Sequence, residues 1–156
     1  MFDLFKKKVT LQQIKIVAQN LAQNSVLGDI YLLNGELGSG KTTFTRFFIN
    51  SIFKKNFIKK PDSIKSPSFP IMINYSLKNF EVFHYDLYRL INENELKELN
   101  INENIKKNIT LIEWPQLIID SSQLNNYFFI NLTIISPSER MIEIIHTHNK
   151  TFNNEI

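Results

Sequence analysis

The stretch Gly35-Glu36-Leu37-Gly38-Ser39-Gly40-Lys41-Thr42 decides the fold of this chain. It fits the pattern G-x-x-x-x-G-K-[ST] of a phosphate-binding loop. Glycine permits backbone angles that a Cβ would penalise, so successive N–H groups can turn inward around an anion. Lys41 places a point charge between the β- and γ-phosphates, and the Thr42 hydroxyl has the right length to ligand Mg²⁺. The stretch therefore predicts a site for a nucleoside triphosphate and Mg²⁺.

The segments on either side of this loop support the prediction. Residues 29–34 form a short apolar run that favours a strand. Residues 43–53 favour a buried helix, because Phe44, Phe48, Ile49 and Ile52 recur at helical spacing. The positive N-terminal end of such a helix points at the bound phosphates.

The composition is that of a soluble globular protein. The 156 residues are 43% hydrophobic and contain no cysteine, which favours a single domain, 1–156, without disulfides. No apolar run is long enough to span a bilayer, and the charges of residues 1–8 follow an apolar patch, the reverse of a signal peptide. We therefore expect a cytoplasmic protein with no membrane contact. The net charge is +3, and the chain is rich in Asn, Ile and Lys. AT-rich coding would produce this bias, so the lysines are weak evidence for nucleic-acid binding.

The remaining segments predict helices and a lysine-rich surface. Residues 10–27 favour a helix with a capping box, an apolar stripe and Gly28 as its stop signal. The capping pair is Thr10 and Gln13, and the stripe consists of Leu11, Ile14, Val17, Ala18 and Leu21. The polar residues 91–108 suggest short helices. The lysines of residues 54–61 favour a solvated face, although phosphate or an acidic partner could also bind there.

Two predicted strands end in carboxylates. Residues 71–77 and 81–85 favour paired strands, and the second leads into Asp86; residues 109–112 lead into Glu113. An acid at the end of an apolar strand is where a triphosphatase keeps a carboxylate for magnesium or for positioning water. Asp86 and Glu113 are therefore competing candidates. Before them, two prolines in residues 64–70 predict a stiff loop that carries Ser66 and Ser68 and could sense the γ-phosphate.

The C-terminal part predicts a hairpin. Residues 127–135 and 140–146 alternate in polarity and are separated by a Ser-Pro-Ser-Glu turn. His146 and His148 share one strand face, but without a third ligand a zinc site is disfavoured. Residues 149–156 are expected to fray. The elements together predict an α/β fold of the P-loop NTPase type, with a mixed sheet flanked by helices and an antiparallel C-terminal hairpin.

Four stretches, in this order, resemble the TsaE (YjeE) family of bacterial ATPases. They are the phosphate loop with its strand, Ser66-Pro67-Ser68-Phe69, His84-Tyr85-Asp86-Leu87-Tyr88-Arg89-Leu90 and Ile112-Glu113-Trp114-Pro115. The phosphate loop alone is unspecific, whereas the last two stretches together are specific. The resemblance covers about residues 10–117. It implies a slow, Mg²⁺-dependent ATPase that acts on a TsaB–TsaD complex in forming threonylcarbamoyladenosine at position 37 of tRNAs that read ANN codons. It implies contact with tRNA only through that complex, and we expect a monomer.

The resemblance also implies roles for single residues. Lys41, Asp86 and Glu113 are the implied catalytic residues, and Thr42 and Glu113 the implied Mg²⁺ ligands. The implied nucleotide-binding residues are Gly35, Leu37, Gly38, Ser39, Gly40, Lys41, Thr42, Thr43, Ser68 and Trp114. The chain departs from the family where Ser68 replaces threonine and Asn100 replaces glycine; Asn tolerates left-handed angles better than most residues.

Two other classes of function stay open on the sequence. A small-molecule kinase needs cations that close over the transferring phosphoryl group, and this chain has only Arg46, Arg89 and Arg140. A binding module could hold the nucleotide as a switch and hardly turn it over. A GTPase is disfavoured because the guanine-reading Asn-Lys-x-Asp motif is absent from the sequence.

Overall fold

The computed structural model describes residues 3–121 and 124–147, and in these ranges seven strands form one mixed sheet. The strands are β1 (Asp3–Thr10), β2 (Ile30–Asn34), β3 (Met72–Ser76), β4 (Glu81–Asp86), β5 (Ile109–Glu113), β6 (Phe128–Ser136) and β7 (Glu139–His146). Their order across the sheet is β1-β7-β6-β2-β5-β4-β3. The central pairs β6–β2, β2–β5 and β5–β4 are parallel, and the outer pairs are antiparallel. The predicted mixed α/β architecture is confirmed.

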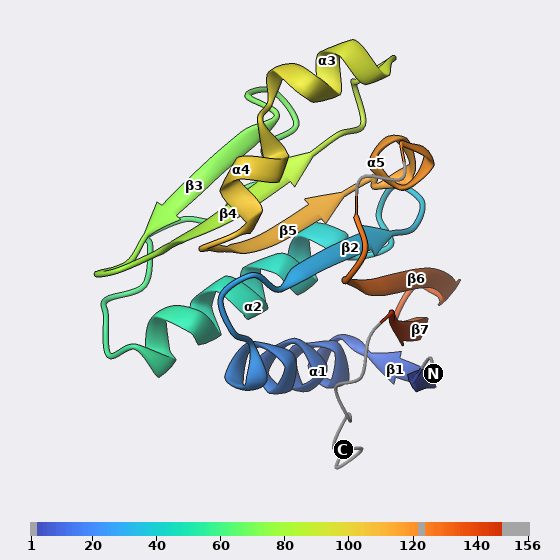
Figure 1. Ribbon diagram of the computed structural model, residues 1–156. Helices are drawn as coiled ribbons and strands as arrows, with labels where there is room; N and C mark the ends of the chain where they lie inside the picture. Colours follow the sequence, from blue (N-terminus) through green and yellow to red (C-terminus); the bar gives the residue numbers. More distant parts are fainter. Residues whose placement is uncertain (1–2, 122–123, 148–156) are drawn as a thin grey trace.

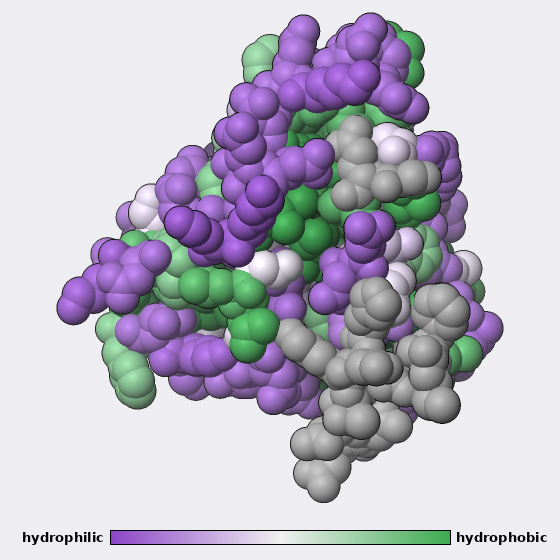
Figure 2. Space-filling model, viewed as in Figure 1, coloured by the Kyte–Doolittle hydropathy of each residue, from purple (hydrophilic) through white to green (hydrophobic). Residues whose placement is uncertain are grey.

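Helices cover both faces of the sheet (Figure 1). The helices are α1 (Leu11–Asn24), α2 (Lys41–Lys55), α3 (Glu93–Glu98), α4 (Ile101–Ile105) and α5 (Gln116–Asp120). The long helices α1 and α2 pack side by side on one face, and the three short helices lie on the other. Two buried apolar clusters, one per face, therefore hold the sheet between the helix layers. Figure 2 shows hydrophilic side chains over most of one side of the molecule, with apolar residues in smaller patches between them.

The central strands explain where the site forms. Every residue of β5 and the first four of β2 are buried, as expected for parallel strands that are covered on both faces. Parallel strands end at the same edge of the sheet, and ligands bind at that edge in open α/β folds. The register pairs Asp86 with Glu113 and Glu113 with Leu33, so both carboxylates end beside the phosphate loop that follows β2.

Helix α1 confirms the capping box and corrects two details of the prediction. The N–H of Thr10 donates to Gln13 Oε1 at 2.9 Å, and the N–H of Gln13 donates to Thr10 Oγ1 at 3.4 Å. The helix ends at Asn24 instead of Leu27, because the Asp29 carboxylate accepts the N–H of Val26 at 2.9 Å and holds that segment in a turn. Leu11 does not join the buried stripe. It is the first helical residue, where the chain leaves β1, and it is 58% exposed.

Strand β1 was not predicted. Three consecutive lysines conceal its alternation, in which Phe5, Lys7 and Val9 are the less exposed residues. β1 is an edge strand of the sheet, and Lys6 and Lys8 form ion pairs with Glu143 and Glu139 of β7. Lysines are common on edge strands because their charge discourages pairing with another chain.

Other predicted elements hold with small shifts at their ends. Helix α2 begins at Lys41, two residues before the predicted start, and it buries Phe44, Phe48, Ile49 and Ile52 as expected. The C-terminal hairpin is formed by β6 and β7, and Asn100 adopts a left-handed φ of 49°. Among the described residues, no helix is long and apolar enough to cross a membrane. His148 and residues 149–156 lie outside the described ranges.

Candidate nucleotide-binding site

The phosphate loop requires glycine at three positions. Gly38 and Gly40 have φ values of 77° and 109°, in the left-handed region that strains other residues. Gly35 has a φ of 146° and is needed for a second reason as well. A Cβ there would lie 2.4 Å from the carbonyl oxygen of Leu132 in β6 and 2.5 Å from Ser39 Oγ. The base of the loop therefore rests directly on the backbone of the neighbouring strand.

Lys41 lies in the middle of the site and is buried. Its Nζ donates to the carbonyls of Gly35 at 2.6 Å and Glu36 at 3.0 Å, and it lies 3.9 Å from the centre of the Trp114 ring. Burial lowers the pKa of Lys41, while the nearby charges of Glu113, Asp86 and Glu36 act in the opposite direction. These contacts hold the ammonium group at the loop where phosphates are expected to bind.

Glu113, at the end of β5, uses both carboxylate oxygens. Oε2 accepts the Thr42 hydroxyl at 3.0 Å, and Oε1 accepts from His84 Nε2 at 2.8 Å. Because Thr42 gives its hydrogen to Glu113, the lone pairs of its oxygen stay available for a cation. This geometry fits the predicted pair of Mg²⁺ ligands, since Mg²⁺ prefers oxygen and is usually bound through one or two protein oxygens together with substrate phosphates and waters. The described residues contain no cluster of three or more His, Cys, Asp or Glu side chains suited to a metal ion.

Asp86, at the end of β4, is held differently. Its Oδ2 accepts the Ser66 hydroxyl at 2.7 Å, and its Oδ1 accepts the backbone N–H of Tyr88 at 3.1 Å. Asp86 is therefore tied to the proline-rich loop rather than to the phosphate loop. Both carboxylates are buried, so each needs the hydrogen bonds that it has.

Trp114 is held in an unusual backbone conformation. Its φ is 56°, which is rare for a bulky residue, and its N–H donates to the carbonyl of Leu33 at 3.2 Å. The ring packs 4.8 Å from that of Tyr88, at an angle of 51°. Strain of this kind costs about 1–3 kcal/mol and gathers at functional sites. Here it turns the indole back over Lys41.

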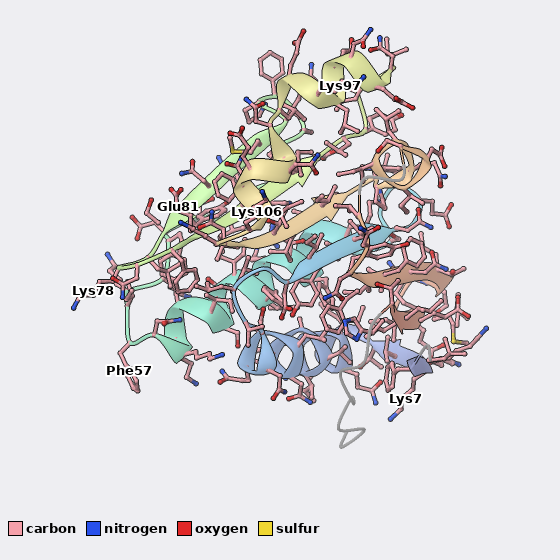
Figure 3. All side chains as sticks on the ribbon, in the orientation of Figure 1. Lys7, Phe57, Lys78, Glu81, Lys97 and Lys106 are labelled. Atoms are coloured by element: carbon pink, nitrogen blue, oxygen red, sulfur yellow. The ribbon has the colours of Figure 1, made fainter. Side chains whose placement is uncertain are left out.

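The predicted residues surround a cleft of about 410 Å³. Those that line it are Leu37, Gly38, Gly40, Lys41, Thr42, Thr43, Ser68, Asp86, Glu113 and Trp114. Ser66 and Tyr88 complete the lining. Gly35 and Ser39 belong to the loop but do not line the cleft, and Ser39 is fully buried. The lysine-rich segment lies elsewhere, since Figure 3 shows Phe57 projecting at the end of the molecule opposite the loop between β2 and α2.

Two residues with a place in the site were missed by sequence reasoning. His84 was seen only as part of a motif, although its position two residues before Asp86 puts it on the same strand face. Arg140 donates to the carbonyls of Ser39 and Gly38 in the phosphate loop, which lie 101 and 102 residues before it in the chain. Arg89, one of the three arginines in the chain, donates to the backbone carbonyls of Ser68 and Phe69.

Comparison with known proteins identifies the family to which the chain belongs. Residues 9–142 match the family model described as threonylcarbamoyl adenosine biosynthesis protein TsaE. The chain is 38% identical over 152 residues to the tRNA threonylcarbamoyladenosine biosynthesis protein TsaE of Rickettsia prowazekii, covering 97% of this chain and 98% of the relative. The TsaE of Bacillus subtilis is 31% identical over 113 residues, which are 72% of this chain and 66% of that protein.

A solved structure shares the fold of this chain. The crystal structure of Bacillus subtilis YdiB superposes with a TM-score of 0.73 at 25% identity, and the match covers 96% of this chain and 89% of that one. The resemblance seen in the sequence motifs is thus confirmed along most of the chain, and the protein belongs to the TsaE family.

Proposed function

We propose that this protein is a Mg²⁺-dependent ATPase that supports formation of threonylcarbamoyladenosine at position 37 of tRNAs reading ANN codons. The observation that carries the proposal is the hydrogen bond of 3.0 Å between Thr42 and Glu113. It joins the last residue of the phosphate loop to a strand-end carboxylate, which is the pairing that triphosphatases use beside a nucleotide. The names of the relatives supply the link to tRNA modification.

The residues of the cleft divide the work. Lys41 would exchange its carbonyl partners for phosphate oxygens, and the loop N–H groups would bind the same phosphates. Thr42 and Glu113 would hold Mg²⁺, which when bound neutralises charge on the phosphates. Asp86 would orient the attacking water or the waters around the metal. Ser68 would bring a hydroxyl to the γ-phosphate side of the cleft.

The surroundings of the cleft support dependence on a protein partner. Lys41 is the one basic residue among the described residues that line the cleft. Arginine supplied from outside can raise phosphoryl-transfer rates by about 10³–10⁵. Leu37, Phe69, Tyr88 and Ile91 are large apolar side chains that are more than 60% exposed, and Leu37 and Tyr88 belong to the cleft wall. A TsaB–TsaD-like complex that covers this mouth would complete the site, and its work on tRNA would place the protein in the cytoplasm.

The two rival functions receive less support. A small-molecule kinase needs several cations over the transferring phosphoryl group, but Arg89 and Arg140 are both occupied by backbone carbonyls. A binding module without turnover would not need a second buried carboxylate beside the first. An assay of phosphate transfer to nucleosides, sugars and small acids separates the kinase from the proposal, and single-turnover hydrolysis separates the binding module.

The test is a single-turnover measurement of ATP hydrolysis with Mg²⁺, with and without the cognate TsaB–TsaD complex. We expect turnover well under ~1 s⁻¹ for the protein alone, which is the low end for enzymes, and a clear increase with the complex. Trp114 is the only tryptophan in the chain, so its emission reports on the same surface without labelling. Fast hydrolysis by the isolated protein, with neither signal changed by the complex, would contradict the proposal.

A further inference from the structure

Arg140 connects the C-terminal hairpin to the phosphate loop. It lies near the start of β7, and its guanidinium donates to four backbone carbonyls. Nε donates to Ser39 at 3.0 Å, and Nη2 donates to Gly38 at 3.1 Å. Nη1 donates to Ser136 at 2.7 Å and to Glu139 at 2.9 Å, both at the hairpin turn. Within the described residues its hydrogen bonds are all to carbonyl oxygens, and no carboxylate neutralises its charge.

These bonds act on the peptide units that face the nucleotide. A trans peptide unit is planar, with its C=O and N–H pointing in opposite directions. Fixing the carbonyl of Ser39 from behind therefore fixes the direction of the Gly40 N–H, and Gly40 lines the cleft. A cationic donor on the carbonyl also polarises the peptide unit, which makes its N–H a stronger donor to an anion.

The neighbouring peptide unit is held at both ends. Arg140 binds the carbonyl of Gly38, and the N–H of Ser39 in the same unit donates to the carbonyl of Glu36 at 3.1 Å. That Glu36 carbonyl also accepts from Lys41. A continuous set of hydrogen bonds thus runs from Arg140 through the loop to the lysine of the site.

The loop needs such support because the glycines at two of its positions have no side chains that could hold its backbone in place. Gly38 and Gly40 have no Cβ that could pack, and an added Cβ would meet nothing within 4 Å at either position. Flexible glycines lose much conformational entropy when they become ordered around a ligand. A group that orders them in advance lowers this cost and so raises affinity.

We propose that Arg140 is a positioning residue for the nucleotide, and that the C-terminal hairpin thereby holds the phosphate loop ready to bind. This inference rests on the proposed function only in that the loop binds a nucleoside triphosphate. It does not depend on hydrolysis or on a partner. Arg140 itself lies behind the loop and does not line the cleft.

The experiment compares Arg140→Gln and Arg140→Lys with a matched control, Arg46→Gln. Arg46 also donates its Nε to a backbone carbonyl, that of Ile64 at 3.1 Å, but it neither lines the cleft nor contacts the phosphate loop. ATP affinity is measured by calorimetry with Mg²⁺, and thermal unfolding is measured without nucleotide. We expect Arg140→Gln to weaken ATP binding about tenfold, because the charged hydrogen bonds that order the loop before binding are lost. Arg46→Gln is expected to leave ATP affinity unchanged.

Further readouts separate positioning from mere stability. Arg140→Lys keeps the charge but loses the fork that binds two carbonyls, so it should fall between the parent protein and Arg140→Gln. Turnover at saturating ATP should change less than affinity, because the loop binds ground state and transition state alike. The chain has only four glycines, so the amide NMR signals of Gly38 and Gly40 can be followed in the nucleotide-free protein. These signals should move in Arg140→Gln and not in Arg46→Gln.

The outcomes distinguish two failures. If the parent protein binds no ATP, the proposed function is wrong. If the parent binds ATP and Arg140→Gln binds it equally well, the role of Arg140 is wrong and the proposed function stands. If Arg140→Gln fails to fold, the decision falls to Arg140→Lys, for which unchanged ATP affinity and unchanged glycine signals would overturn the inference.

Discussion

The ends of β4 and β5 place two carboxylates side by side in register, yet they bind different parts of the molecule. Asp86 and Glu113 are 4% and 2% exposed, so burial does not distinguish them. Their partners do. Glu113 is held by Thr42 on a long helix and by His84 on a central strand, whereas Asp86 is held by Ser66 in an irregular loop and by a backbone N–H.

We infer from this difference that the two carboxylates have different tasks. A ligand for Mg²⁺ must keep a fixed position, and supporting contacts from regular structure provide that for Glu113. Asp86 moves with loop 66–69 if that loop responds to the nucleotide, since the Ser66 hydroxyl is bonded directly to it. The interpretation is that Glu113 serves the metal and Asp86 serves the reacting phosphate. Four changes test it, and they follow in order of decreasing effect.

The largest effect is expected from Lys41→Ala, which removes the ammonium group expected to bind the phosphates. Both carboxylates act on the charge of this group. Losing a charged donor to phosphate costs about 1.5–3 kcal/mol, so ATP affinity should fall on the order of 10–100-fold in calorimetry. Lys55→Ala is the matched control, since Lys55 also binds two backbone carbonyls, those of Gln23 and Ser25, far from the cleft. Equal ATP affinity in the two variants would mean that the phosphate loop is not the ATP-binding site.

Glu113→Gln should come next, and it should act through the metal. The amide oxygen can still accept from Thr42 or His84, so the fold is preserved, but the negative charge is lost. We expect the Mg²⁺ concentration that gives half-maximal hydrolysis to rise about 10–100-fold, as for other changes around metal ligands. The measurement is a Mg²⁺ titration at fixed ATP. An unchanged Mg²⁺ requirement would mean that Glu113 is not the metal-side carboxylate.

Asp86→Asn should lower turnover without a comparable change in the Mg²⁺ requirement. The amide oxygen can accept the Ser66 hydroxyl, but it no longer attracts a proton from water. A general base that takes the proton itself contributes about 10²–10⁴-fold, and Asp86 is expected only to orient water, so we expect turnover to fall by about tenfold. Single-turnover rates and nucleotide affinity are compared with those of Glu113→Gln. If Asp86→Asn shifts the Mg²⁺ titration and Glu113→Gln does not, the two roles are exchanged.

The smallest effect is expected from Ser66→Ala. One hydrogen bond to the Asp86 carboxylate is lost, which is worth roughly 1 kcal/mol or about fivefold in a rate. Ser76→Ala offers the control, because the Ser76 hydroxyl also binds a carboxylate, Glu81 at 3.2 Å, on exposed strands away from the cleft. A loss of hydrolysis with Ser66→Ala and none with Ser76→Ala would tie the loop to Asp86. Identical rates in both variants would show that the loop contact is not used.

Much of the site was within reach of sequence reasoning because local rules govern it. The phosphate loop needs glycines, a lysine and a hydroxyl at set spacing, and the structure brings Lys41, Thr42 and Glu113 together as expected. Helix α2 and the central strands followed from apolar periodicity. Strand β1 did not, because its three lysines mask the alternation of polarity. Leu11 was wrongly placed in the buried stripe of α1, because it lies where the chain leaves β1 and is exposed there.

The remaining features depend on contacts between distant segments. Physics alone could not rank Asp86 against Glu113, since each is an acid at the end of an apolar strand. Their roles separate only when Thr42 and Ser66 come into contact with them through the packing of α2 and loop 66–69. In the same way, Arg140 carries no local signal, because an arginine at a hairpin turn is common, and its direction is set by the pairing of β6 with β2.

Sequence alone was therefore sufficient to predict the residues of one loop, namely its glycines, the lysine at its end and the hydroxyl that follows. The pattern of these residues is local, since backbone angles and side-chain lengths are properties of neighbouring residues. The tertiary structure determined the contacts around the loop. It placed Glu113 against the Thr42 hydroxyl, Asp86 against Ser66, and Arg140 of the C-terminal hairpin against the glycine-rich backbone. Those contacts depend on the order and register of parallel strands, because long-range pairing brings together side chains that are far apart in the chain.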